Sequence, residues 1–202
     1  PFDHRTYADM ALPDPTFLAR IDALRRETGL VWVLDDVRAG FRHDLGGSHR
    51  YFGFTPDLSC FSKAIANGYA LSACVGNEGL RSAASRVFAT GSFWNNPAPM
   101  AAALKPLEIL ERDDCISAML RRGGEWVERF VALGVEKGLE FTASGTPTMP
   151  FIRIADDPHF YAQQAFCCEA VKAGVFLHPH HNWFIGHAHT DAVLEESLQL
   201  ID

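Results

Sequence analysis

Lysine is the scarcest charged residue in this sequence, with four lysines against fourteen arginines. The sequence has no tract of basic residues, and its formal net charge is −7. Nucleic acids and anionic membrane surfaces are therefore poor candidates for partners. No apolar run approaches the ~20 residues of a membrane-spanning helix. The 48% of hydrophobic residues is ordinary for a globular protein and argues against global disorder.

Cysteine occurs five times, without the pattern of a disulfide framework or a zinc ribbon. The number is odd, no C-x-x-C is present, and Cys167 and Cys168 are adjacent. No signal peptide opens the sequence. We therefore expect free thiols in a reducing compartment, and a cytoplasmic protein.

The hydrophobic pattern alternates between helix and strand and contains no internal repeat. Asp14-Pro15 predicts the start of a helix that Gly29 ends. The continuous apolar run 30–34 predicts a strand buried on both faces of a parallel sheet. Pro106 should kink or split the helix that Pro97 starts. The other expected elements are strands at 56–61, 71–75, 141–143, 149–154 and 175–177, and helices at 78–88, 114–137, 158–173 and 191–201.

Two structural regions follow from this order of elements. Residues 1–115 predict an α/β region with a mainly parallel sheet, and residues 116–202 a small α+β domain. We expect the boundary to fall inside the long helix, near 112–125.

Lys63 is the first candidate for chemistry, because it follows a short predicted strand and stands among apolar and small residues. A lysine that loses hydration favours its neutral, nucleophilic amine, which a Schiff-base lysine requires. A surface lysine capping a strand end is the simpler interpretation of this residue taken alone.

Asp35 is the second candidate, at the carboxyl end of the run 30–34. Ligands of open α/β sheets collect at the carboxyl ends of strands. A buried carboxylate there needs a cation, which could be a protonated pyridine nitrogen or a guanidinium of Arg38 or Arg42. A carboxylate ending one strand and a lysine ending another is the layout that a pyridoxal phosphate site needs.

Three ordered motifs and the end of the chain make the resemblance specific. Leu34-Asp35-Asp36-Val37-Arg38-Ala39-Gly40-Phe41-Arg42 resembles the F-D-E-V-x-T-G-F-R segment of class III aminotransferases. Thr55-Pro56-Asp57-Leu58 with Ser62-Lys63-Ala64-Ile65-Ala66-Asn67-Gly68 resembles their T-P-D-L and lysine segment. Thr90 to Pro97 with Met100-Ala101-Ala102-Ala103 resembles their G-T-x-x-x-N-P-x-x-M-A-A segment. Residues 174–177 and 188–191 resemble the end of their small domain. The similarity is greatest to the branch of glutamate-1-semialdehyde aminomutase.

The resemblance implies a PLP-dependent transferase of fold type I, an α/β fold, seen as its C-terminal half. Residues 1–115 would be a partial PLP-binding large domain and 116–202 the small C-terminal domain. Lys63 would be the Schiff-base lysine and proton shuttle, Asp35 the partner of the pyridinium nitrogen, and Val37 a contact of one ring face. Ser92 would bind the cofactor phosphate across a homodimer interface.

The sequence departs from the family in three ways. Asp36 stands where Glu is usual, with little expected effect on the cofactor, and Ser92 replaces Thr. The N-terminal half that would carry the phosphate-cradling turn has no match. The sequence opens with Pro1 rather than Met, so we expect part of a longer polypeptide that by itself binds PLP weakly or not at all.

Histidine is concentrated near the C-terminus, with five of nine within 178–189. The resemblance accounts for this stretch without a metal, and we expect none. His181 and Trp183 could line a substrate entrance, or belong to a loop packed at the domain boundary.

The function expected from these residues is PLP-dependent transfer of an amino group between small amino and oxo substrates, as an aminotransferase or an intramolecular aminomutase. The alternatives are a cofactor-free remnant that acts as a dimerisation or interaction module, and a metal-binding protein that uses the histidines.

Overall fold

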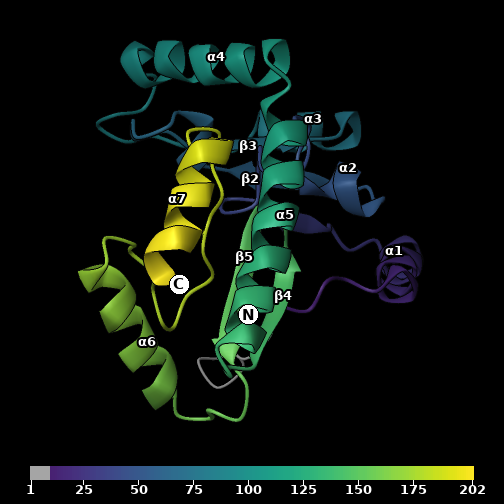
Figure 1. Ribbon diagram of the computed structural model, residues 1–202. Coiled ribbons are helices and arrows are strands. Elements are labelled where there is room, and N and C mark those ends of the chain that lie inside the picture. The colour runs from purple at the N-terminus through teal and green to yellow at the C-terminus, as the bar shows by residue number, and fades with distance from the viewer. Residues whose placement is uncertain (1–9) are drawn as a thin grey trace. The chain divides into compact units, whose positions relative to one another are not determined.

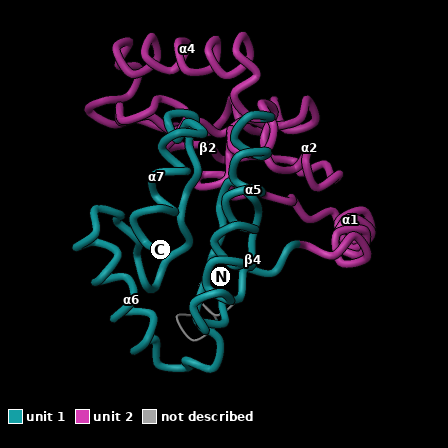
Figure 2. The backbone as a smooth tube through the Cα atoms, in the orientation of Figure 1, with its two compact units in different colours: residues 1–12, 117–202 teal, residues 13–116 magenta. Residues whose placement is uncertain are grey.

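The computed structural model describes residues 10–202, which form two compact units. One unit spans residues 13–116, and the other spans residues 117–202 together with the segment that ends at Leu12 (Figure 2). The expectation about the Pro1 start lies outside the described residues. The predicted division at 115/116 into a partial cofactor domain and a small domain stays a prediction about the whole protein.

The unit of residues 13–116 is built on a three-stranded sheet with the order β1-β2-β3. Figure 1 labels β2 and β3 of this sheet. Strand β1 (Val33–Asp35) pairs in parallel with β2 (Leu58–Phe61), which pairs antiparallel with β3 (Ala73–Gly76). Its helices are α1 (Pro15–Thr28), α2 (Ser48–Phe52), α3 (Arg81–Ala84) and α4 (Pro97–Arg112), with short 3₁₀ turns η1 (Lys63–Ile65) and η2 (Glu78–Leu80).

The ends of α1 confirm the sequence prediction. The Asp14 carboxylate accepts a hydrogen bond from the backbone N–H of Thr16, and Gly29 ends the helix in the left-handed conformation. Such a cap satisfies backbone groups that the helix leaves free at its end.

The prediction of a doubly buried strand at 30–34 is wrong for this chain. Strand β1 has three residues, and the side chains of Leu30, Val31 and Val33 are 59%, 48% and 51% exposed. Among residues 10–202, β1 pairs with β2 alone. An apolar run shows that a segment is suited to burial, but the covering layers must come from other parts of a polypeptide.

Two helix predictions in this unit also need correction. The helix expected at 78–88 shortens to the turn η2 and the four residues of α3. Helix α4 is not split at Pro106 but continues to Arg112. Proline removes one backbone hydrogen bond, which packing of the flanking turns can outweigh: Ala103 and Leu107 pack in a core with Phe41, Phe61 and Ile65.

The unit of residues 117–202 contains most of α5 (Cys115–Glu136), a hairpin of β4 (Phe141–Thr146) and β5 (Met149–Ile154), α6 (Tyr161–Lys172) and α7 (Asp191–Ile201). Phe130 of α5 is 1% exposed and touches the rings of Trp126, Phe141 and Trp183. The predicted strand at 175–177 does not form. No helix of the described chain combines the length and the apolar character needed to cross a membrane.

Candidate active site

Asp35 and Lys63 are brought to one edge of the sheet by the parallel pairing of β1 and β2. Asp35 is the last residue of β1 and lies opposite Cys60, and Lys63 follows β2 by two residues. The carboxyl ends of parallel strands meet at the same edge, where open α/β sheets bind ligands. The sequence predicted that each residue lies at the end of a strand, and the register shows in addition that the two strands are neighbours.

Lys63 occupies an uncommon backbone conformation at this edge. Its φ is 48°, in the left-handed region that costs a non-glycine residue about 1–2 kcal/mol. Ile65 and Ala66, 8% and 1% exposed, anchor the chain directly after it. The Ser62 hydroxyl before it donates a hydrogen bond to the carbonyl of Leu71 at 3.0 Å. A strained backbone that is held on both sides is typical of functional positions.

The Lys63 side chain is exposed, so the expected loss of hydration does not occur in this chain. The apolar residues around it in sequence, Phe61 and Ile65, point into the core instead of around the amine. Lys63 is nevertheless distinguished from the other lysines. Lys105, Lys137 and Lys172 form ion pairs with Glu108, Asp202 and Glu169. Lys63 forms none with a described residue, so no carboxylate of the described chain competes for its amine.

Asp35 is also exposed, which corrects the expectation of a buried carboxylate. Its Oδ1 accepts a hydrogen bond from the backbone N–H of Val37 at 3.2 Å. Val37 is half-buried in the turn that follows. An exposed carboxylate at a strand end can face an added cationic ring, and Val37 presents an apolar side chain two residues away.

Asp36 has a structural role that the sequence analysis missed. It is 1% exposed, and its carboxylate accepts hydrogen bonds from the backbone N–H and the hydroxyl of Ser48 at 2.8 and 2.6 Å. Gly47, with φ of 111°, leaves room for this carboxylate: an added Cβ would lie 2.9 Å from its Oδ2. The available signal was the consecutive pair of acids, since neighbouring strand residues face opposite sides. Asp36 thus fixes the loop that follows Asp35.

His43 lies buried in the same loop and contacts the rings of Tyr51 and Phe52. Burial lowers the pKa of His43 from its ordinary value, against the opposing effect of the Asp36 carboxylate. A neutral imidazole in such a place packs as an aromatic ring.

Ser92 lies in an exposed turn before α4 and forms no hydrogen bond with Asp35, Val37 or Lys63. Every residue from 81 to 95 is exposed, including Phe88 at 91% and Phe93 at 84%. Aromatic side chains exposed to this degree are typical of surfaces that contact another molecule or another part of a polypeptide.

His181 and Trp183 lie in the other unit, along an apolar cavity of about 420 Å³. Trp183 is 8% exposed and donates its Nε1–H to the carbonyl of His178 at 2.9 Å, so it is part of the core. His181 is half-buried, with Nδ1 2.6 Å from the carbonyl oxygen of Asn182. Burial, followed by the neighbouring His181 and His180, lowers the pKa of His178. A role of His181 and Trp183 at a substrate entrance stays a prediction.

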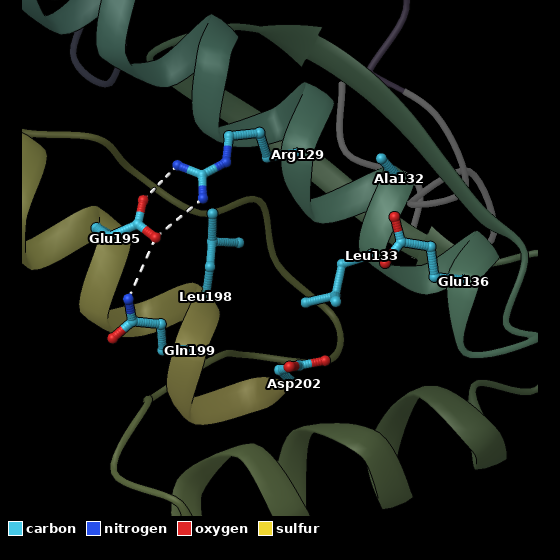
Figure 3. A pocket seen from close by; sticks show the side chains of 8 residues that line it. All are labelled: Arg129, Ala132, Leu133, Glu136, Glu195, Leu198, Gln199 and Asp202. Atoms are coloured by element: carbon cyan, nitrogen blue, oxygen red, sulfur yellow. Dashed lines mark hydrogen bonds and ion pairs between the residues drawn. The ribbon is translucent and has the colours of Figure 1, made fainter.

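A second cavity of this unit, about 330 Å³, lies between α5 and α7 (Figure 3). Arg129 forms an ion pair with Glu195, which also accepts a hydrogen bond from Gln199 at 3.3 Å. Arg129 and Glu195 thus satisfy each other at this cavity. Within residues 10–202, no three His, Cys, Asp or Glu side chains gather in a group that could hold a metal ion.

Comparisons with known proteins identify the family of the chain. The family model of class-III aminotransferases matches residues 8–199. The aminopentol aminotransferase of Sphingopyxis macrogoltabida is 39% identical over the whole chain, and a 3-aminobutyryl-CoA aminotransferase of Cloacimonas acidaminovorans is 36% identical. This chain spans 48% and 50% of these two relatives. A glutamate-1-semialdehyde 2,1-aminomutase of Methanosarcina acetivorans is 29% identical over 93% of this chain and 48% of its own.

Solved structures show the same fold. The FumI protein of Sphingopyxis sp. MTA144, solved in its PLP internal aldimine form, superimposes with a TM-score of 0.91 at 39% identity. The match covers 96% of this chain and 47% of that one. An omega-transaminase from Sphaerobacter thermophilus has a TM-score of 0.83 at 21% identity, over 96% of this chain and 48% of its own, and supports the fold alone. The expected PLP-dependent transferase fold of type I is confirmed, as is the expectation that the chain spans about half of its relatives. The chain belongs to the class-III aminotransferase family.

Proposed function

We propose that the protein to which this chain belongs transfers an amino group between an amino donor and an oxo acceptor, with pyridoxal 5′-phosphate as cofactor. One observation carries the proposal. Asp35 and Lys63 end two neighbouring parallel strands, and Lys63 stands there in a strained backbone with no ion pair to a described residue. The residues at this edge fit the cofactor, because they offer an available amine and an exposed carboxylate together.

Each residue at this edge has a distinct task in the proposal. Pyridoxal phosphate supplies, when bound, an aldehyde carbon for amines and an electron sink for the substrate carbanion. The Asp35 carboxylate would hold a proton on the ring nitrogen, and the Val37 side chain would pack on one ring face. The Ser92 hydroxyl would bind the phosphate. Lys63 Nζ would hold the cofactor by its aldehyde carbon, and it would be the base that takes the proton from the substrate α-carbon and returns it.

The names of the relatives favour transfer between two molecules. The relatives at 39% and 36% identity are aminotransferases, and the aminomutases stand at 28–29%. We therefore place aminotransferase before aminomutase. Amino transfer from one carbon skeleton to a second oxo compound would distinguish the two reactions.

Borohydride trapping tests the proposal on the chain itself, and it detects weak as well as tight binding. Sodium borohydride makes the attachment of PLP to a lysine amine permanent, and peptide mapping then locates the modified lysine. The chain supplies its own controls, because it holds four lysines and three of them are ion-paired. We expect modification at Lys63 to exceed that at Lys105, Lys137 and Lys172.

Two variants sharpen this test. Lys63→Arg keeps the positive charge but removes the reactive amine, so it should abolish the selective modification, whereas Lys105→Ala should leave it unchanged. Equal modification of these four lysines in the complete, folded protein would contradict the proposal. A folded, dimeric chain that takes up no PLP at Lys63 would support the alternative of a cofactor-free interaction module.

We also propose a homodimer and a cytoplasmic location for the whole protein. The exposed segment 81–95, with Phe88, Phe93 and Trp94 around Ser92, supports contact with a second copy. Five free cysteines support a reducing compartment. Sedimentation of the complete protein tests the homodimer. The double variant Phe93→Ala with Trp94→Ala should shift the equilibrium from dimer toward monomer.

A further inference from the structure

Cys60 and Cys74 face each other across the antiparallel pair of β2 and β3. They are register partners, and their Sγ atoms lie 3.9 Å apart. Residues directly opposite in a ladder point to the same face of the sheet. Asp35 is the register partner of Cys60 on the other side, so Asp35, Cys60 and Cys74 form one row across the three strands.

The hydrogen-bond pattern shows that Cys60 and Cys74 form the kind of cross-strand pair in which the Cα atoms are closer together. The backbone N–H of Asn77 donates to the carbonyl of Asp57 at 3.0 Å, which makes the opposed pair 57/77 a hydrogen-bonded one. Hydrogen-bonded and non-hydrogen-bonded pairs alternate along an antiparallel ladder. The pair 60/74 is therefore non-hydrogen-bonded, with Cα atoms about 4.5 Å apart, inside the usual range of about 4.4–6.8 Å for bridged cysteines.

The two thiols differ in how easily a reagent reaches them. Cys74 is exposed and Cys60 is partly covered. Burial, together with the hydrogen bond and charge of Cys74 and the charge of Asp35, raises the pKa of the Cys60 thiol. Cys74 is thus the thiol that a reagent meets first, and Cys60 is the protonated neighbour within reach. Cys115 and Cys167 are buried, and burial raises the pKa of Cys167 to about 11.

We propose that Cys60 and Cys74 are a redox modification site, which a peroxide converts to an intramolecular disulfide and a thiol reductant restores. Cys74 sulfur attacks a peroxide oxygen, so that an S–O bond forms and the O–O bond breaks, giving a sulfenic acid and one water. Cys60 sulfur then attacks the Cys74 sulfur: the S–S bond forms, the S–O bond breaks, and the oxygen leaves as the second water. Two thiols are oxidised and one hydrogen peroxide is reduced to two waters.

The site fits the compartment proposed for the protein. In a reducing compartment the pair rests as free thiols, and a disulfide forms transiently under oxidant. The disulfide would link β3 to β2, the strand that precedes Lys63. It would form next to Asp35, the register partner of Cys60 on β1. The chemistry of the pair does not depend on pyridoxal phosphate, so its test stands apart from that of the proposed function.

The experiment exposes the 202-residue chain to hydrogen peroxide, blocks the remaining thiols with an alkylating agent in denaturant, and measures the intact mass. We expect loss of two hydrogen atoms and three alkylated cysteines in place of five. Peptide mapping should find 60 linked to 74, and dithiothreitol should restore five alkylated cysteines. Cys74→Ser and Cys60→Ser should each abolish the linked peptide, while Cys168→Ser, at the other exposed cysteine, should leave it unchanged.

Several outcomes would overturn the proposal. One is a folded chain in which peroxide adds oxygen atoms to Cys74 while Cys60 stays alkylatable. Another is a disulfide that involves Cys168, or that joins two chains, in place of the bond between Cys60 and Cys74. Circular dichroism of each variant establishes that the comparison is made on folded protein, and the wild-type mapping decides the matter without any variant.

Discussion

Helix α5 contains two successive glycines, Gly123 and Gly124. Replacing each of them with alanine should change the free energy of unfolding in opposite directions. Glycine in a helix interior costs about 1 kcal/mol relative to alanine, and neither residue has a positive φ. An added Cβ at Gly124 meets nothing within 4 Å. An added Cβ at Gly123 would overlap the carbonyl oxygen of Pro147 and lie 3.4 Å from the Ile185 side chain. Helix propensity alone predicts that both substitutions stabilise the chain.

The expected magnitudes follow from these surroundings. Gly124→Ala should raise the free energy of unfolding by about 0.5–1 kcal/mol, from helix propensity alone. At Gly123 the same gain is opposed by overpacking, which costs about 1–3 kcal/mol and occasionally more. The neighbour is backbone in the turn between β4 and β5, which cannot rotate away as a side chain can. Gly123→Ala should therefore lower the free energy of unfolding by up to about 2 kcal/mol.

Urea unfolding followed by tryptophan fluorescence measures both variants, because Trp126 and Trp183 belong to the same core as α5. The midpoint should rise for Gly124→Ala and fall for Gly123→Ala, with an unchanged slope. If both variants were as stable as the wild type or more so, α5 could not approach the turn at Pro147 as closely as the structure shows. Gly124→Ala is then the matched control, since it has the same chemistry one residue away.

Three further predictions concern the unit of residues 13–116. Asp57 accepts hydrogen bonds from the backbone N–H of Trp32 and from Arg25, which lower the pKa of its carboxyl group. The stabilisation by Asp57 is therefore fully present above about pH 4 and is lost as the pH falls through the pKa of the folded state. Asp57→Asn should make the stability measured by circular dichroism depend less on pH in this acid range. Asp36→Ala leaves two buried donors of Ser48 without an acceptor and should cost about 1–3 kcal/mol in urea unfolding, and a value near zero would contradict the geometry. A disulfide between Cys60 and Cys74 closes a loop of 15 residues, and the oxidised chain should gain up to about 3 kcal/mol over the reduced one in denaturant without reductant; no gain would mean strain in the bridged strands.

Local signals in the sequence identify much of the fold. Asp14-Pro15 and Gly29 bound α1 because capping and backbone conformation act within a few residues. The helix expected at 114–137 is α5, since an amphipathic period repeats over many turns. The short elements were predicted less well. Residues 78–88 and 175–177 depend on what covers them, and Phe88 and Phe176 are 91% and 79% exposed.

The candidate site also has some features that the sequence predicts and others that only the fold shows. The order of the motifs predicted Asp35, Val37, Lys63 and Ser92 as site residues, and the paired strands bring Asp35 and Lys63 to one edge of the sheet. The motifs did not indicate that Asp36 is buried and holds Ser48. Its partner lies 12 residues away, and only the folded loop brings the two together.

The sequence by itself determined the family, the longer helices, and the lysine on which the proposed chemistry depends, because motif spacing and helix signals are local properties. Only the tertiary structure decided which residues are buried and which residues lie opposite each other. It left β1 and Lys63 exposed, because burial requires layers supplied by distant residues. The strand register places Cys60 opposite Cys74. The fold brings the backbone of Pro147 close to Gly123 and leaves open space beside Gly124. Each of these depends on which remote backbone comes near, and no residue specifies that alone.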